Sequence, residues 1–146
     1  MKRVRLNLTS TPMAMSLDML RKLGYAAVPV EHRPKIPGFD VPITRDLFGF
    51  ADIVAMREHF LFVQTTSAAN VTARMRKIQG CELFEAVKRA GGLVHVHGWG
   101  PGGVRVVDMT AKDETGAFVY ATLWDSVLRS GRRSKNRPRV QTVLEL

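Results

Sequence analysis

Residues 51–66 read ADIVAMREHFLFVQTT, and this stretch decides the fold. It contains two apolar runs, residues 51–56 and 60–66, separated by a three-residue polar connection. Short apolar runs joined by a connection of that length predict a β-hairpin of two adjacent antiparallel strands. Side chains alternate between the faces of a strand, so Gln64 and Thr66 are expected on one face with Thr65 on the other.

The segments around this hairpin predict alternating helices and strands. Residues 10–24 have apolar positions at helical spacing behind a Ser10 or Thr11 cap, and Gly24 is a stop signal. After the hairpin, a strand over 93–96 is expected to cross back into the same sheet, because a helical stretch precedes it. The other expected elements are a strand over 25–30, a loop over 32–42, helices from 67–70 to about 78 and over 81–90, a glycine-rich turn over 98–103, a strand over 104–109, strand or helix over 117–128, and a short edge strand over 140–146.

Length and composition predict one folded α/β domain. The chain has 146 residues, of which 45% are hydrophobic and 24% charged, as in ordinary globular proteins. Its single cysteine, Cys81, excludes an internal disulfide framework and a four-cysteine zinc site. The basic start lacks the apolar stretch of a secretory signal, and no segment approaches the roughly 18 apolar residues of a membrane span. We therefore expect a cytoplasmic protein with no membrane partner.

Net charge points to a polyanionic partner. Lys and Arg total 22 against 13 Asp and Glu, which gives a formal charge of +9. Such an excess attracts nucleic acid, although an anionic membrane or an acidic protein would also satisfy it. Much of the charge lies in the basic segment 129–139, which either contacts phosphates or is a solvated tail. The residues expected to contact nucleic acid are Arg76, Arg132, Arg133, Lys135, Arg137 and Arg139.

Oxygen-bearing side chains are expected to meet at one end of the hairpin. Asp52 opens the first strand, while Gln64 and Thr66 close the second. Oxygen ligands of this kind suit Mg²⁺, which keeps several waters and activates them for attack on phosphorus. Two structural alternatives remain open: Asp52 bonds to an arginine or a backbone amide, and the polar run merely ends a strand and caps the next helix.

The order Gly24-Tyr25, Arg45-Asp-Leu-Phe-Gly49, Ala51-Asp-Ile-Val-Ala55 and Phe62-Val-Gln-Thr-Thr66 resembles the PD-(D/E)XK nuclease superfamily, in particular its small Holliday-junction-resolvase-like and VRR-NUC-like members. The resemblance covers roughly residues 13–99. It implies a restriction-endonuclease-like αβββαβ core around a site that binds Mg²⁺ or Mn²⁺ and hydrolyses DNA phosphodiester bonds, with branched or structured DNA among the substrates. It also implies a homodimer and a bacterial or bacteriophage source.

The resemblance also assigns roles to individual residues. Asp52 takes the place of the metal-binding aspartate, Gln64 that of the second acidic residue, and Thr66 stands where the catalytic lysine is expected. In some relatives the basic group lies on the following helix, where this chain has Arg74 and Lys77 on one face. Further metal ligands are expected from the preceding segments, and the candidates there are Glu31 and Asp46.

Other functions compete with this reading. A nuclease fold that has lost catalysis and only binds nucleic acid would explain Gln64 and Thr66 equally well. A basic protein of a mobile element or bacteriophage that docks on an acidic partner would explain the charge. His95 and His97 alternate with valines, so they share one strand face and could bind metal or exchange protons, but burial inside the sheet is the stronger reading.

Overall fold

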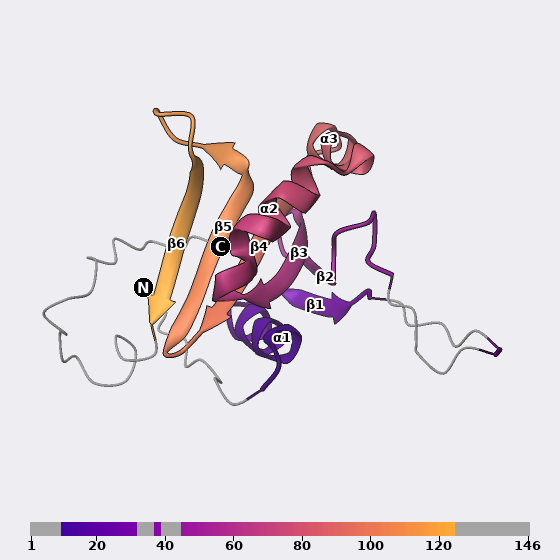
Figure 1. Cartoon of the computed structure of the whole chain (residues 1–146), viewed down its shortest axis with the longest axis vertical. Helices are drawn as coiled ribbons and strands as arrows, with labels where there is room; N and C mark the ends of the chain where they lie inside the picture. The colour runs from indigo at the N-terminus through magenta and orange to yellow at the C-terminus, as the bar shows by residue number, and fades with distance from the viewer. Residues whose placement is uncertain (1–9, 32–36, 39–44, 125–146) are drawn as a thin grey trace, which may run out of the picture.

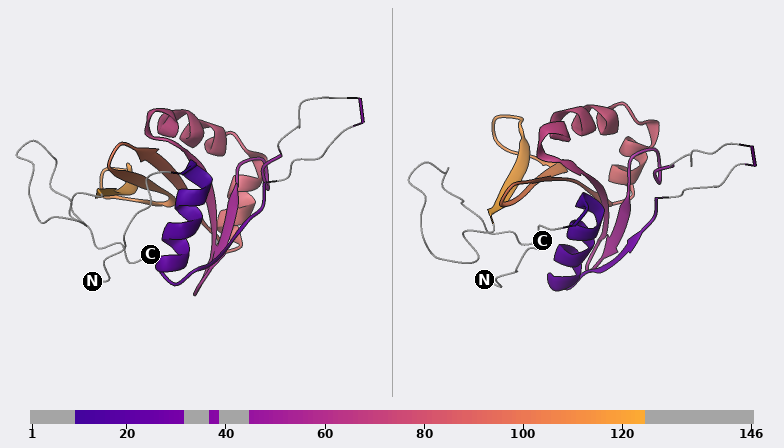
Figure 2. Two further views of the ribbon diagram at one scale, coloured as in Figure 1. Left: turned by 90° about the horizontal axis from the view of Figure 1, so that it is seen from below. Right: turned by 60° about the horizontal axis from the view of Figure 1, so that its bottom comes forward.

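A computed structural model describes residues 10–31, 37–38 and 45–124 of the chain. In these residues a six-stranded mixed sheet has helix α1 on one face and helices α2 and α3 on the other (Figures 1 and 2). The predicted α/β class, with a mixed sheet flanked by helices, is confirmed. The elements are α1 (Pro12–Lys22), β1 (Ala26–Pro29), β2 (Ile53–Met56), β3 (Phe60–Ser67), η1 (Ala68–Asn70), α2 (Val71–Gln79), α3 (Glu82–Arg89), β4 (Leu93–Gly100), β5 (Gly103–Lys112) and β6 (Phe118–Trp124).

The first helix begins and ends where its sequence signals predict. The Thr11 side chain accepts a hydrogen bond from the Ala14 amide at 3.3 Å, and Pro12 occupies the first turn, where a missing N–H costs nothing. Gly24 follows the helix with a φ of +94°, a backbone conformation that favours glycine. The helix buries Met15, Met19 and Leu20 against the sheet.

The hairpin and the crossover are both confirmed. Strands β2 and β3 pair antiparallel with Ile53 opposite Val63. Strand β4 then pairs parallel with β3, with Val63 opposite His95, after a connection through α2 and α3. The complete strand order is β1-β2-β3-β4-β5-β6, and only the β3–β4 pair is parallel. The carboxyl ends of β1 and β3 therefore lie at the same end of the sheet as the start of β2.

The expected glycine-rich turn over 98–103 is wrong in its extent. Strand β4 continues through Gly98 and Trp99 to Gly100, and the turn is confined to Pro101 and Gly102. Gly98 is required by close packing, because a Cβ there would lie 2.2 Å from Cγ2 of Val71 at the start of α2. Glycine inside a strand commonly marks such a close approach, which local sequence cannot distinguish from a turn.

Several expectations fall outside the described residues. They are most of the loop over 32–42, the part of 117–128 beyond Trp124, the edge strand over 140–146, and the basic segment 129–139 with Arg132, Arg133, Lys135, Arg137 and Arg139. Within 117–124 the undecided segment is a strand, β6. In the described part of the chain, no helix is long and apolar enough to cross a membrane.

Candidate functional site

Three carboxylates meet at the end of the sheet where β1 and β3 finish and β2 begins. Glu31 follows β1, Asp52 precedes β2, and Asp46 comes from the loop that leads into β2. One carboxylate oxygen of each lies within 4.8 Å of those of the other two. The Val30 amide donates to the Asp52 carbonyl at 2.8 Å, so the backbone of β1 positions Glu31 beside Asp52.

Asp52 is held by hydrogen bonds that all reach one of its oxygens. Its Oδ2 accepts from Gln64 Nε2 at 2.7 Å, from the Thr65 amide at 2.8 Å and from Thr65 Oγ1 at 3.1 Å. Its Oδ1 receives none of these bonds. The carboxylate is therefore fixed through Oδ2, while Oδ1 can act as a ligand.

The contact with Thr65 was not predicted. Strand alternation puts Thr65 on the face opposite Gln64, yet both bond to the same oxygen of Asp52. The pairing of β2 with β3 is irregular at this point. Val63 pairs with Ile53, and its carbonyl also accepts a hydrogen bond from the preceding amide, that of Asp52, at 2.8 Å. The Thr65 amide then bonds to the carboxylate, and its hydroxyl follows. Asp52 and Thr65 are 13 positions apart in the chain, so no local sequence signal predicts this contact.

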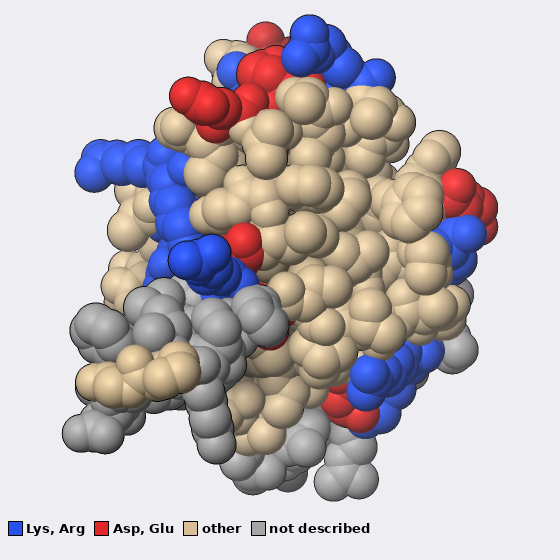
Figure 3. Space-filling model, turned by 90° about the vertical axis from the view of Figure 1, so that its right-hand side faces the viewer, with Lys and Arg blue, Asp and Glu red and all other residues tan. Residues whose placement is uncertain are grey.

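A lysine from helix α2 reaches the same cluster. Lys77 Nζ lies 2.6 Å from Asp46 Oδ2 and donates to Gln64 Oε1 at 3.5 Å. The Asp46 side chain is 14% exposed and that of Lys77 is 36% exposed. Of the two basic residues that the sequence offers on this helix, Lys77 is the one with contacts to Asp46 and Gln64. Figure 3, which faces the side that β1 and β2 occupy in Figure 1, shows acidic and basic atoms adjoining one another at several places on this surface.

Burial and like charge set the protonation of Asp52. The pKa of Asp52 is raised to about 6, chiefly by burial and also by the neighbouring Asp46 carboxylate, while the hydrogen bonds from Thr65 act in the opposite direction. Three carboxylates converge here, and Lys77 forms an ion pair with one of them, Asp46. Oxygen donors with this charge fit a hard divalent cation such as Mg²⁺ or Mn²⁺, and Glu31, Asp46 and Asp52 would hold it.

The remaining predicted site residues lie nearby or elsewhere on α2. Thr66 is buried on β3 with its Cα opposite Gly98, and the hydrogen bonds to Asp52 come from Thr65 instead. Arg74 is partly buried on α2, one turn before Lys77, and Arg76 is exposed on the same helix. The structure therefore brings Glu31, Asp46, Asp52, Gln64 and Lys77 together.

The two strand histidines belong to a separate, sealed network on the α1 face. His97 Nδ1 lies 2.8 Å from Ser16 Oγ, which also accepts from Trp99 Nε1 at 2.8 Å. His95 Nε2 lies 3.8 Å from Asp108 Oδ2. Both histidines are buried, as the reading of burial inside the sheet predicts. Burial lowers the pKa of His97 to about 3, and the nearby His95 acts in the same direction, so His97 is neutral.

The comparisons with known proteins leave the geometry as the only guide to function. No protein-family model matches the chain, and a search of curated proteins finds none that is similar.

Proposed function

We propose that this protein is a metal-dependent nuclease that hydrolyses DNA phosphodiester bonds. The observation that carries the proposal is the meeting of Glu31, Asp46 and Asp52 within 4.8 Å, with the Lys77 ammonium on the same cluster. All four residues were expected at such a site from sequence. Carboxylates for a divalent cation beside a basic group for the phosphate form the combination that metal-assisted phosphodiester hydrolysis requires.

The order of elements supports membership of the PD-(D/E)XK superfamily. Helix α1, the antiparallel strands β1 to β3, helix α2 and a strand β4 parallel to β3 follow one another as that resemblance implies. The candidate site lies where the superfamily's metal-binding aspartate is expected, at Asp52. The restriction-endonuclease-like fold, the homodimer, branched DNA as substrate and a cytoplasmic location belong to the same proposal.

Gln64, Thr65 and Lys77 have distinct roles in the proposed reaction. A bound Mg²⁺ or Mn²⁺ ion supplies Lewis-acid stabilisation and activates water at neutral pH. Gln64 and Thr65 fix the Asp52 carboxylate through Oδ2, so that its other oxygen would be available to hold the ion. Lys77 supplies the positive charge of the lysine that is expected at position 66, where this chain has Thr66. Its ammonium can move from Asp46 to the phosphate as negative charge develops there.

A second candidate function is DNA binding without cleavage. It is favoured by the pairing already present at the site: Lys77 neutralises Asp46, and Asp52 accepts three hydrogen bonds. Carboxylates with such partners can be stable without a metal ion. In that case the cluster would be structural, and the positive charge of the chain would hold the phosphate backbone.

Cleavage and binding assays separate the two functions. Purified protein is incubated with branched, single-stranded and duplex DNA in the presence of Mg²⁺ or Mn²⁺, alongside Asp52→Asn and the control Asp18→Asn. Asp18 is an exposed aspartate on α1 that pairs with Lys22, far in sequence from the cluster. We expect the wild type and Asp18→Asn to cut and Asp52→Asn to fail. Salt-sensitive binding by all three without cutting would favour the binder, and no binding at all would exclude both functions.

A further inference from the structure

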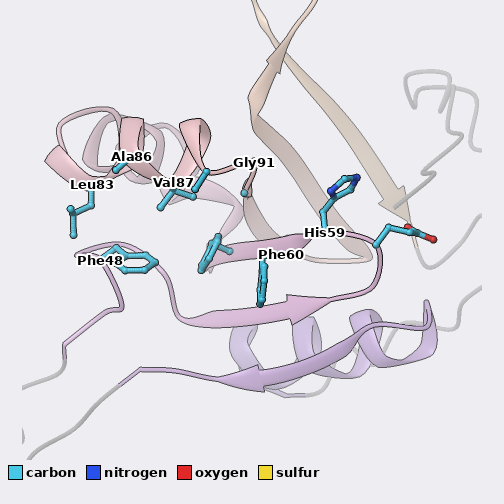
Figure 4. Close-up of a pocket in the computed structure, with 11 residues that line it drawn as sticks. Phe48, His59, Phe60, Leu83, Ala86, Val87 and Gly91 are labelled. Carbon is cyan, nitrogen blue, oxygen red and sulfur yellow. The ribbon is translucent and has the colours of Figure 1, made fainter.

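An apolar groove lies between helix α3 and the β2–β3 hairpin (Figure 4). It has a volume of about 430 Å³, which is within the usual range of ligand sites. Phe48, Phe60 and Phe62 line its hairpin side, while Leu83 and Val87 line its α3 side. Apart from Glu58 and His59 at the hairpin connection, the described lining residues carry no charge.

The three phenylalanines form a continuous aromatic wall. The Phe48 and Phe62 ring centroids are 5.5 Å apart at 60°, and those of Phe60 and Phe62 are 6.5 Å apart with the rings nearly parallel at 23°. Phe60 is 56% exposed and Phe48 is 38% exposed. Aromatic side chains at the surface forgo the stabilisation that burial would bring, so a row of them beside a groove indicates a binding surface.

This wall begins at the candidate site. Phe60, Phe62 and Gln64 lie on the same face of β3, and residues two apart on a strand are separated by about 6.6 Å. That spacing resembles the distance between successive phosphates of an extended DNA strand. Phe48 belongs to the same short loop as Asp46 and adopts a φ of +57°, which is rare for a bulky residue. The loop thus directs a carboxylate to the cluster and a ring to the groove.

Two lysines lie near the groove, and each forms an ion pair with a carboxylate. Lys77 lies at the carboxylate end and pairs with Asp46, while Lys88 on α3 pairs with Glu85 at 2.9 Å and has its Nζ 4.6 Å from the Phe84 ring centroid. Figure 3 shows a broad surface without charged atoms between the places where acidic and basic atoms meet. Cations for phosphates combined with exposed rings for bases are the combination by which proteins bind single-stranded nucleic acid.

We propose that this groove binds unpaired nucleobases of the strand whose phosphate lies at the carboxylate cluster. The bases stack on Phe60, Phe62 and Phe48, and the substrate strand is single-stranded next to the scissile bond. This inference rests on the proposed nuclease function and adds the kind of DNA that the site accepts. The apolar wall has no hydrogen-bonding groups that would read base identity, so stacking here is tolerant of sequence.

Binding of labelled oligonucleotides tests the groove separately from catalysis. Fluorescence anisotropy in metal-free buffer compares a single strand, the same strand with abasic sites, and the duplex. We expect Phe60→Ala to weaken binding of the single strand at least about fivefold, because one stacked base contributes about 1–3 kcal/mol. Ala86→Leu, which fills the groove from α3, should do the same, while Phe60→Tyr retains the ring and the affinity. Val119→Ala is the control, since Val119 is a 43% exposed valine on edge strand β6.

The outcomes distinguish the groove from the nuclease. Abasic strands should bind the wild type at least as weakly as intact strands bind Phe60→Ala, with duplex binding equal in both proteins. If the wild type cuts DNA but neither Phe60→Ala nor abasic sites alter its binding of single strands, the groove proposal is wrong and the nuclease stands. If the wild type neither binds nor cuts any DNA, both are wrong. If Phe60→Ala instead converts a dimer to a monomer in sedimentation and abasic sites have no effect, a second copy of the chain covers the groove.

Discussion

The two faces of the sheet differ in the kind of polar side chains that they carry. On the α1 face, Ser16, His97 and Trp99 are buried and joined by hydrogen bonds of 2.8 Å, and His97 is neutral. On the α2 face, three carboxylates approach within 4.8 Å of one another, and Lys77 forms an ion pair with one of them, Asp46. The first arrangement is uncharged at His97, and it leaves His95 Nδ1 and His97 Nε2 buried without a hydrogen-bond partner among the described residues. The second brings three acidic side chains together beside a lysine.

This difference indicates which face carries function. A neutral network of buried side chains joined by direct hydrogen bonds contributes to the packing of a core. Concentrated like charge is unfavourable unless a cation offsets it, and it therefore points to a ligand. Thr65 lies where the faces meet, because its Cα is opposite His97 while its amide and hydroxyl bond to Asp52.

The largest expected effect is the fall in cleavage rate when the Lys77 ammonium is removed from the α2 face. Lys77→Met should lower the DNA cleavage rate about 100-fold or more, because removal of one group that stabilises transition-state charge typically costs that much. The apolar stem of the lysine is retained, so the fold should persist. Single-turnover cleavage of a labelled oligonucleotide measures the rate, and circular dichroism checks the fold.

Arg74→Met is the matched control for this substitution. Arg74 lies three residues before Lys77 on α2, and in the structure it is Lys77 that reaches Asp46 and Gln64. We expect a smaller loss of rate for Arg74→Met than for Lys77→Met. The reverse order would transfer the role of the missing lysine from Lys77 to Arg74.

Breaking the network on the α1 face should affect stability without affecting chemistry. Ser16→Ala removes the group that bonds to both His97 Nδ1 and Trp99 Nε1, which leaves two buried polar atoms without that partner. The free energy of unfolding should fall by about 1–3 kcal/mol. Urea unfolding measures this change, with the exposed Ser67→Ala as control. A lowered cleavage rate per folded Ser16→Ala molecule would show that the two faces are coupled.

The contributions of the two faces to the pH dependence of stability should have opposite signs. His97 has a folded pKa of about 3 against an ordinary 6.5, so the unfolded state binds more protons between these values and stability falls as the pH drops through that range. Asp52 has a folded pKa of about 6 against 3.8, so its contribution is present below 3.8 and is lost as the pH rises towards 6. The two contributions oppose each other between pH 3.8 and 6.

Asp52→Asn removes the contribution of Asp52 to the pH dependence of stability and leaves that of His97. Between pH 4 and 6, the stability of Asp52→Asn should rise with pH more steeply than that of the wild type, by up to about one proton equivalent. His97→Gln should change the slope in the opposite direction. Urea unfolding at several pH values measures both slopes. Parallel curves for the wild type and both variants would mean that neither group titrates as the structure implies.

The sequence predicted most of the fold because its signals were local. The Thr11 cap, the hairpin over 51–66 and the helix stops at Gly24 and Gly91 depend on residues close in the chain, and each matches an element boundary. The extent of β4 could not be predicted in this way. Its Gly98 is explained by contact with Val71, which lies 27 positions earlier in the chain and meets it only in the folded protein.

The candidate site was predicted as a set of residues but not as a set of contacts. Glu31, Asp46 and Lys77 could be named from the chemistry that a metal-dependent nuclease needs, and the structure brings them to Asp52 and Gln64. Which of them bond to one another depends on the paths of a loop and a helix that carry no local signal. The aromatic groove was missed because its wall reads as ordinary strand sequence.

The smallest expected effect distinguishes two neighbouring threonines. Thr65→Val removes the hydroxyl that donates to Asp52 at 3.1 Å but keeps the amide that donates at 2.8 Å, so the cleavage rate should fall only a few-fold, as expected for about 0.5–1.5 kcal/mol. Thr66→Val is the matched control, since valine has nearly the same shape and Thr66 is the residue that strand alternation assigns to the site. We expect Thr65→Val to reduce the rate more than Thr66→Val, measured at saturating Mg²⁺ and at limiting Mg²⁺, with the larger difference at limiting Mg²⁺. A larger effect at Thr66 would mean that the regular alternation of β3, rather than the irregular pairing at Asp52, determines which hydroxyl serves the carboxylates.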